Sequence, residues 1–124
     1  MPKKRILIVD DERDICESLS AHFKEEGYSV NITHNGQEAL EHVHAQKPDA
    51  IVLDIFMPVM DGVSFLSELR REEENMKAGE AIPVILITAC YMEGMMKELP
   101  VSAVILKPVL FDELLSEVKQ TLKN

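Results

Sequence analysis

The sequence predicts an α/β fold in which a single parallel β-sheet is covered by helices on both faces. Strand-like and helix-like segments alternate five times along the 124 residues, with no low-complexity linker between them. Four of the strand-like segments are continuous apolar runs, as expected for strands buried on both faces of a parallel sheet. A chain of this length holds one hydrophobic core. We therefore expect one domain over residues 1–124.

The first half of the chain is expected to form two strand–helix units. Residues 6–9 are an apolar run, and apolar side chains then recur at helical spacing over residues 15–23, before Gly27 stops the helix. Residues 28–33 alternate apolar and polar side chains, so only this strand has the composition of a sheet edge. A second helix is expected between residues 35 and 48.

The third apolar run, residues 50–53, runs into Asp54, and a loop over residues 55–60 then leads into a helix for which Asp61 is a good N-cap. The polar stretch over residues 72–81 is where we expect the most flexible connection of the fold. Its first three residues are glutamates, and we interpret them as the solvated end of that helix.

Two more apolar runs, residues 84–87 and 103–106, complete the predicted sheet. A short methionine-rich helix is expected between them, with apolar residues at i, i+3, i+4 and i+7 over residues 92–99. This spacing favours core packing over a partner surface. A last helix is expected to bury Phe111, Leu114, Leu115, Val118 and Leu122.

Charge and composition exclude several functions. The formal net charge is −9, which argues against binding to nucleic acid or to an anionic membrane surface. The only basic cluster, residues 3–5, is too short for a nucleic-acid patch, and no apolar stretch is long enough to span a bilayer. Cys16 and Cys90 lie far apart without a CxxC motif, so we interpret them as reduced thiols in a cytoplasmic protein and not as a disulfide.

Polar side chains with a shared chemistry stand at the ends of four predicted strands. The first apolar run leads into Asp10 and Asp11, the third into Asp54, the fourth into Thr88 and the fifth into Lys107. In an open parallel sheet the carboxyl ends of the strands border the crevice in which ligands bind. Three carboxylates there favour a hard divalent cation such as Mg²⁺, while the ammonium and the hydroxyl suit the oxygens of a phosphoryl group.

Each of these residues also has an ordinary structural explanation when it is taken alone. Asp10 and Asp11 could cap the following helix, Asp54 could end its strand at a turn, Thr88 could be a cap, and Lys107 could be a surface lysine. Their joint occurrence at the ligand-binding edge of the sheet favours the functional interpretation.

These positions also carry a resemblance to a known family. The chain contains, in order, Ile8-Val9-Asp10-Asp11-Glu12, the block Asp54-Ile55-Phe56-Met57-Pro58-Val59-Met60-Asp61-Gly62, Thr88-Ala89 and Lys107-Pro108. With these motifs, the whole chain resembles the receiver domain of bacterial two-component response regulators. The resemblance implies a flavodoxin-like, doubly wound fold with strand order 2-1-3-4-5 and a cis peptide bond between Lys107 and Pro108.

The resemblance implies a phosphoacceptor switch. Asp54 would accept a phosphoryl group from the phosphohistidine of a sensor histidine kinase or a phosphotransfer protein, and Thr88 and Lys107 would contact that group. Such a protein is not an enzyme toward other substrates, because it catalyses only its own phosphorylation and dephosphorylation. The phosphorylated form would act on a downstream effector protein or on an output domain outside this chain.

The resemblance also implies a metal requirement. Mg²⁺, or Mn²⁺ in its place, would be bound directly by Asp11, Asp54 and the backbone carbonyl of Phe56, with Asp10 acting mainly through water. It further implies no direct contact with nucleic acid or membrane, a cytoplasmic location, and a monomer or weak dimer.

The chain departs from the family pattern at three places near its C-terminal end. The family's signalling aromatic, three residues before the lysine, is Val104 here. The Gly-Ala pair that usually precedes the fifth strand is replaced by residues 100–103, and the spacing from Thr88 to Lys107 is slightly short. None of these departures touches the phosphorylation chemistry. All three concern the route by which the signal reaches the output surface.

Three other functions compete with this interpretation. A haloacid-dehalogenase-type phosphatase would need a second aspartate two residues after the nucleophile, where Phe56 stands. A flavodoxin-like electron carrier would need a Ser/Thr/Gly-rich phosphate loop after the first strand, where this chain has three acids. A degenerate receiver that acts as a phosphorylation-independent interaction module is the remaining alternative, and the complete set of acids, Thr88 and Lys107 argues against it.

Overall fold

The computed structural model describes residues 3–55, 57, 60–74, 76, 80–89 and 99–122. The elements in these residues are, in chain order, β1 (Arg5–Val9), α1 (Arg13–Glu25), β2 (Ser29–Thr33), α2 (Gly36–Ala45), β3 (Ala50–Asp54), α3 (Gly62–Glu73), β4 (Val84–Thr88), β5 (Ala103–Leu106) and α5 (Phe111–Thr121). The short helix predicted over residues 92–99 lies outside the described residues, apart from Leu99.

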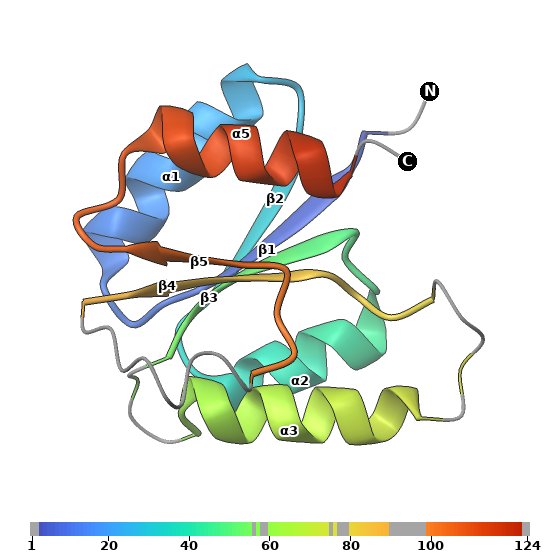
Figure 1. Cartoon of the computed structure of the whole chain (residues 1–124). Helices are drawn as coiled ribbons and strands as arrows, with labels where there is room; N and C mark the ends of the chain where they lie inside the picture. The colour runs from blue at the N-terminus through green and yellow to red at the C-terminus, as the bar shows by residue number, and fades with distance from the viewer. Residues whose placement is uncertain are drawn as a thin grey trace.

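The strands form one parallel sheet in the order β2-β1-β3-β4-β5. Helices α1 and α5 cover one face of this sheet, and α2 and α3 cover the other (Figure 1). The predicted α/β class and the strand order are therefore confirmed. All carboxyl ends of the strands lie at the same edge of the sheet, because every neighbouring pair is parallel.

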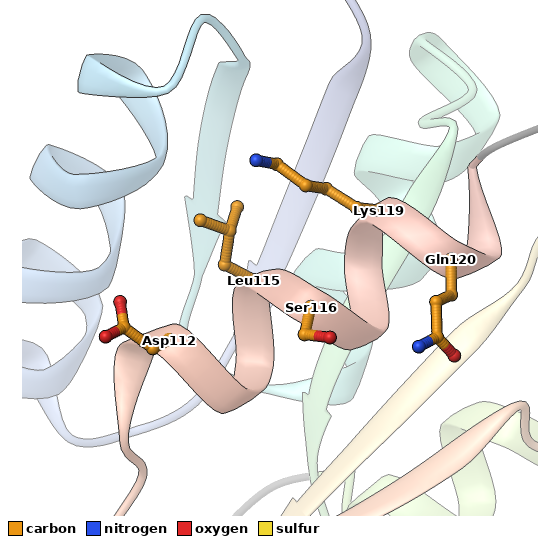
Figure 2. A pocket seen from close by; sticks show the side chains of 5 residues that line it. All are labelled: Asp112, Leu115, Ser116, Lys119 and Gln120. Atoms are coloured by element: carbon orange, nitrogen blue, oxygen red, sulfur yellow. The ribbon is translucent and has the colours of Figure 1, made fainter.

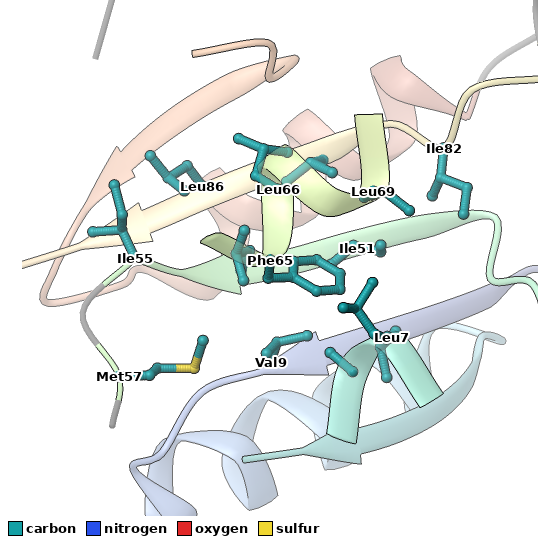
Figure 3. Packing of buried hydrophobic residues seen from close by; sticks show 14 residues of the cluster. Leu7, Val9, Ile51, Ile55, Met57, Phe65, Leu66, Leu69, Ile82 and Leu86 are labelled. Atoms are coloured by element: carbon teal, nitrogen blue, oxygen red, sulfur yellow. The ribbon is translucent and has the colours of Figure 1, made fainter. Parts of the chain in front are cut away.

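Both faces of the central strands are buried, and successive side chains point to opposite faces of the sheet. Leu7 and Val9 of β1 belong to the hydrophobic cluster on the α2–α3 side, whereas Ile6 and Ile8 belong to the cluster on the α1–α5 side. Figure 3 shows the first of these clusters, in which Phe65 of α3 packs over the sheet. This two-sided burial explains why the central strands appear in the sequence as continuous apolar runs.

The helix ends follow local sequence signals. Helix α2 begins after Asn35, whose side chain accepts a hydrogen bond from the backbone N–H of Glu38 at 2.9 Å. Helix α3 begins in the same way after Asp61, as predicted, and α1 is followed by Gly27 at a φ of 96°. Within the described residues, no helix is long and apolar enough to cross a membrane.

The sheet has a second edge that composition did not indicate. Strand β2 lies at one edge, as its alternating pattern predicts, but the apolar strand β5 lies at the other. Leu106 at the end of β5 is 51% exposed. An apolar composition therefore does not show that a strand is central. The position of β5 in the sheet depends on which strands pair with it.

The glutamates at the end of α3 are not uniformly solvated, contrary to the sequence-based interpretation. Glu73 is buried, and its Oε2 accepts a hydrogen bond from the backbone N–H of Ile82 at 2.7 Å. Its Oε1 pairs with the guanidinium of Arg70, which also donates to the carbonyl of Pro100. The end of α3 is thus tied to the start of β4 and to the segment before β5.

Candidate functional site

The predicted site residues meet at the carboxyl edge of the sheet. Asp54 and Thr88 are the last residues of the adjacent strands β3 and β4, and Asp10 and Lys107 directly follow β1 and β5. Asp54 and Thr88 are buried, with exposed fractions of 4% and 0%. The fold therefore brings together residues that are separated by almost a hundred positions in the chain.

The ammonium group of Lys107 is the centre of this cluster. Its Nζ atom lies 2.7 Å from Glu12 Oε1 and 3.0 Å from Asp10 Oδ2. It lies 3.4 Å from Asp54 Oδ2. The Lys107 side chain is only 10% exposed, so these three carboxylates replace much of the water that would surround a surface lysine.

These contacts determine the charge state of Lys107. Burial alone would lower the pKa of an ammonium group. The hydrogen bond to Glu12 and the contacts with Asp10 and Asp54 outweigh burial, and together they raise the pKa of Lys107. Lys107 is therefore cationic at physiological pH, and a cation suits anionic ligand oxygens such as those of a phosphoryl group.

Asp10 is the most deeply buried acid of the cluster, with an exposed fraction of 0%. Its Oδ1 accepts a hydrogen bond from the backbone N–H of Glu12 at 2.9 Å. Its Oδ2 accepts no hydrogen bond of normal geometry from the described residues, and the Lys107 ammonium at 3.0 Å compensates its charge as an ion pair. This oxygen is an acceptor that lacks directed donors.

Glu12 is a member of the cluster that the sequence analysis did not assign. One carboxylate oxygen from each of Asp10, Glu12 and Asp54 lies within 4.8 Å of the others. Glu12 belongs to the acidic run that carried the family resemblance, so its position in that run was the available signal. Its side chain is 55% exposed, which leaves it free to move when a ligand enters the site.

One predicted metal ligand is not part of this cluster, and another is not among the described residues. Asp11 is exposed, and it is not among the carboxylates that approach one another. Phe56, whose carbonyl is the other predicted ligand, lies outside the described residues. The direct metal contacts of Asp11 and Phe56 therefore stay predictions.

Thr88 and Lys107 are linked through the backbone. The carbonyl of Thr88 accepts a hydrogen bond from the backbone N–H of Lys107 at 2.8 Å, which continues the pairing of β4 with β5 beyond the last strand residue. The next peptide bond, Lys107-Pro108, is cis, as the resemblance implied. Val104, at the position of the family's signalling aromatic, is partly buried against the cluster on the α2–α3 side.

Two glycines allow close backbone contacts in the chain that follows β3. A Cβ atom on Gly62 would lie 2.5 Å from Ile55 Cα and 2.6 Å from the carbonyl oxygen of Asp54, and the N–H of Gly62 donates to the carbonyl of Ile55 at 2.9 Å. A Cβ atom on Gly36 would lie 2.6 Å from the carbonyl oxygen of Met60, which accepts a hydrogen bond from Gly36 N–H. Only glycine allows these close backbone contacts.

Pocket size does not identify the site. A surface pocket of about 550 Å³ lies along α5, and Figure 2 shows the side chains that line it. Leu115 is the apolar member of its lining, and the others are Asp112, Ser116, Lys119 and Gln120. None of these residues belongs to the acidic cluster. The chemistry of the cluster identifies the site better than the volume of a pocket does.

The donor atoms of the cluster suit a hard divalent cation. Mg²⁺ prefers a few carboxylate oxygens and keeps several of its waters. Asp10, Glu12 and Asp54 supply oxygens that are close enough to share such an ion, and Asp10 Oδ2 lacks a directed hydrogen-bond donor. Lys107 now supplies the positive charge that these carboxylates require, so a bound cation would compete with the ammonium group for their oxygens.

The fold and the site together define a class of protein. A doubly wound sheet with three carboxylates, a buried threonine and a lysine at its carboxyl edge is the architecture of a receiver domain. The family model described as "Response regulator receiver domain" matches residues 6–119. The chain belongs to this family and is the receiver domain of a two-component response regulator.

Known proteins agree with this assignment. The response regulator MprA of Mycobacterium avium (strain 104) is 41% identical over 85 residues, which are 68% of this chain and 35% of MprA. This chain thus matches about a third of the length of that relative. The Francisella response regulator 1452 receiver domain is 29% identical with a TM-score of 0.87, and the comparison covers 98% of each chain.

A third similar protein comes from a different kind of signalling chain. It is the signal receiver domain of a signal transduction histidine kinase from Syntrophus aciditrophicus, at 31% identity and a TM-score of 0.84. The comparison covers 97% of this chain and 90% of that one. Receiver domains of this fold are therefore found in response regulators and in a kinase.

Proposed function

We propose that Asp54 accepts a phosphoryl group from a phosphohistidine, and that the phosphorylated domain then changes its interaction with an effector. The position of the Asp54 carboxylate carries this proposal, because it is almost completely buried at the carboxyl edge of the sheet beside Lys107. A carboxylate attacks phosphorus only when the charge of the phosphoryl group is neutralised and the reacting atoms are aligned.

The proposed transfer exchanges one bond for another. An oxygen of Asp54 attacks the phosphorus atom, a P–O bond forms, and the P–N bond to the donor imidazole breaks. The electron pair of the P–N bond stays on the imidazole nitrogen, and the product is an acyl phosphate on Asp54. Lys107 would exchange its contact with the Asp54 carboxylate for a phosphoryl oxygen, and the Thr88 hydroxyl would donate to another oxygen.

The proposal includes Mg²⁺, or Mn²⁺ in its place, held by the acidic cluster. When bound, the cation supplies positive charge to the phosphoryl oxygens. Asp10, Glu12 and Asp54 are the carboxylates that would hold it, with Asp11 and the Phe56 carbonyl as ligands implied by the family. The role of the protein groups is to fix the position of the ion and to orient the carboxylate of Asp54.

The proposed partners follow from the same reaction. The donor is a sensor histidine kinase or a phosphotransfer protein, and the recipient of the signal is an effector protein or an output domain outside this chain. We propose a cytoplasmic location, where ATP-dependent kinases act, and no catalysis beyond self-phosphorylation and self-dephosphorylation. Membership of the family supports each of these points.

The function can be tested with a small phosphodonor such as phosphoramidate. In the presence of Mg²⁺, the wild-type chain is expected to gain the mass of one phosphoryl group, and Asp54→Asn is expected to gain none. Asp49→Asn is the matched control, because Asp49 precedes the opposite end of β3 and contacts the backbone N–H of Arg5. Wild-type protein that stays unmodified would instead support a phosphorylation-independent interaction module, and equal modification of Asp54→Asn would show that the phosphoryl group is attached to another residue.

A further inference from the structure

A histidine outside the acidic cluster contacts the backbone of its most buried acid. His34 follows β2 and Asp10 follows β1, and the register of the two strands places Thr33 opposite Val9. The residues after each strand therefore lie side by side. The Nδ1 atom of His34 lies 3.0 Å from the carbonyl oxygen of Asp10.

We propose that His34 is a positioning residue for the acidic site: its Nδ1–H donates a hydrogen bond to the carbonyl of the Asp10–Asp11 peptide and fixes the direction of that peptide. The proposal deepens the phosphoacceptor function and rests on it for its biological role. His34 does not touch the reacting atoms, so it acts only through the peptide.

The neighbours of the ring determine which nitrogen carries the proton. A carbonyl oxygen can only accept a hydrogen bond, so Nδ1 of His34 must be the donor toward Asp10. On the other side of the ring, Nη1 of Arg13 lies 3.1 Å from Nε2 of His34. A guanidinium can only donate, so Nε2 must be the acceptor. Arg13 and Asp10 together select the tautomer with the proton on Nδ1.

The backbone of His34 is also held in place. Its N–H donates to Glu38 Oε1 at 3.1 Å, and Glu38 lies in the first turn of α2, where its own backbone N–H is bound by Asn35. The ring therefore projects from a segment that is anchored to the start of a helix. Such a segment can hold a neighbouring peptide in a fixed direction.

The carbonyl of Asp10 has a second donor, the thiol of Cys16, at 3.2 Å. The backbone N–H of Asp10 donates to the carbonyl of Thr33, also at 3.2 Å. Both polar groups of the Asp10 backbone are therefore used. His34 is the donor that joins the end of β1 to the segment after β2, and Cys16 joins it to α1.

The orientation of one peptide plane affects the positions of two acidic residues. The carbonyl that accepts from His34 belongs to the peptide bond between Asp10 and Asp11, and rotation of that plane turns both residues. Asp10 is a member of the acidic cluster, and Asp11 is a predicted metal ligand. Loss of the His34 hydrogen bond is therefore expected to weaken cation binding while the hydrophobic core stays intact.

The tautomer can be observed directly by NMR. Long-range ¹H–¹⁵N spectra of the whole chain, recorded without metal at mildly alkaline pH, are expected to show a protonated Nδ1 and an unprotonated Nε2 for His34. A proton on Nε2, or rapid averaging of the two tautomers, would overturn the proposal. This measurement needs neither Mg²⁺ nor phosphoryl transfer, so it stands or fails independently of the phosphoacceptor function.

The positioning role is then tested with matched variants in Mg²⁺ titrations followed by calorimetry. His34→Leu removes the donor, and its Kd for Mg²⁺ is expected to rise about tenfold, the lower end of the effect of removing groups that orient metal ligands. His34→Asn offers an amide N–H in place of Nδ1–H and is expected to restore most of the affinity. His44→Leu breaks the contact between His44 and Glu72, outside the cluster, and is expected to leave the Kd unchanged.

The outcomes separate positioning from a structural role. A structural role would lower the unfolding temperature of both His34 variants while their Kd for Mg²⁺ stayed at the wild-type value. That result would overturn the proposal, as would a His34→Asn variant that binds Mg²⁺ as weakly as His34→Leu. If His34→Leu does not fold, the comparison of His34→Asn with wild type and the NMR tautomer still decide the question.

Discussion

At the scale of single residues, Cys16 shows how burial near the site affects titration. The side chain is fully buried, and its thiol donates to the carbonyl of Asp10. Burial, assisted by the negative charge of Asp10, raises the pKa of the Cys16 thiol from 9.0 to about 12. A thiol with this pKa is unreactive at neutral pH, because the thiolate is the nucleophile.

This raised pKa predicts a loss of stability at alkaline pH. Below pH 9.0 the thiol is protonated in the folded and the unfolded chain, so it does not affect folding. Above that pH the unfolded chain loses the proton first, so the free energy of unfolding falls until the folded pKa is reached. Urea unfolding from about pH 8 to about pH 10.5 is expected to show this fall in wild type, by up to about 1 kcal/mol per pH unit after solvent screening.

The free energy of unfolding of Cys16→Ala is expected to fall less steeply over the same range, because the alanine side chain has no thiol proton to lose. Ser20→Ala is a suitable control, since Ser20 is a buried residue of the same helix that does not titrate in this range. Parallel curves for wild type and Cys16→Ala would show that this thiol does not contribute to the alkaline loss.

At the scale of secondary-structure elements, Glu73 connects three of them. Its carboxylate satisfies the N–H of Ile82 before β4 and pairs with Arg70, which binds the carbonyl of Pro100 before β5. Glu73→Ala is expected to lower the free energy of unfolding by about 2 kcal/mol, because it leaves a buried N–H without an acceptor.

Glu74→Ala provides the comparison for this prediction. Glu74 is the exposed C-cap residue of α3, and its loss is expected to cost less than about 0.5 kcal/mol in chemical unfolding. Equal effects of the two substitutions would indicate that the Glu73 contacts carry no net stability.

The sequence predicted the elements well where local signals determine them. The continuous apolar run of β1, the cap at Asp61 and the stop at Gly27 depend on residues within a few positions of each other, and the structure confirms all three. Glu73 was misinterpreted because its partners are far along the chain: nine residues for Ile82 and twenty-seven for Pro100, which it reaches through Arg70. A run of glutamates gives no local sign of such contacts.

The candidate site was predictable for a related reason. In a parallel sheet every strand ends at the same edge, so residues at strand ends such as Asp54 and Thr88 can be placed without knowledge of side-chain contacts. The finer geometry was not predictable. The pairing of Glu12 with Lys107, in place of Asp11, depends on how the chain turns after β1.

At the scale of the whole molecule, charge balance connects the site to global stability. Lys107 is an internal counter-ion for three carboxylates, two of which are buried. Lys107→Met is expected to lower the free energy of unfolding of the metal-free protein by about 2 kcal/mol, because buried charges lose their partner. Mg²⁺ at 100 times its Kd is expected to return about 2.7 kcal/mol by binding the folded state.

The same measurement shows whether Lys107 competes with the cation. Lys107→Met is expected to gain more stability from a given concentration of Mg²⁺ than wild type does, because no ammonium has to be displaced. Lys119→Met is the control, since Lys119 forms an exposed pair with Glu26 at 3.8 Å. An equal gain in wild type and Lys107→Met would show that the ammonium and the cation do not compete.

The close backbone contacts of Gly62 and Gly36 have a mechanical consequence. Helix α3 begins against the backbone of Asp54, and the segment before it is bonded to the start of α2. Asp54, the start of α3 and the start of α2 are therefore joined by close backbone contacts, so under the proposed function α3 is expected to stay in place when Asp54 is phosphorylated. A spectroscopic label on the outer side of α3, for example at the exposed Ser67, offers a stationary origin from which displacements along the β5 edge can be measured.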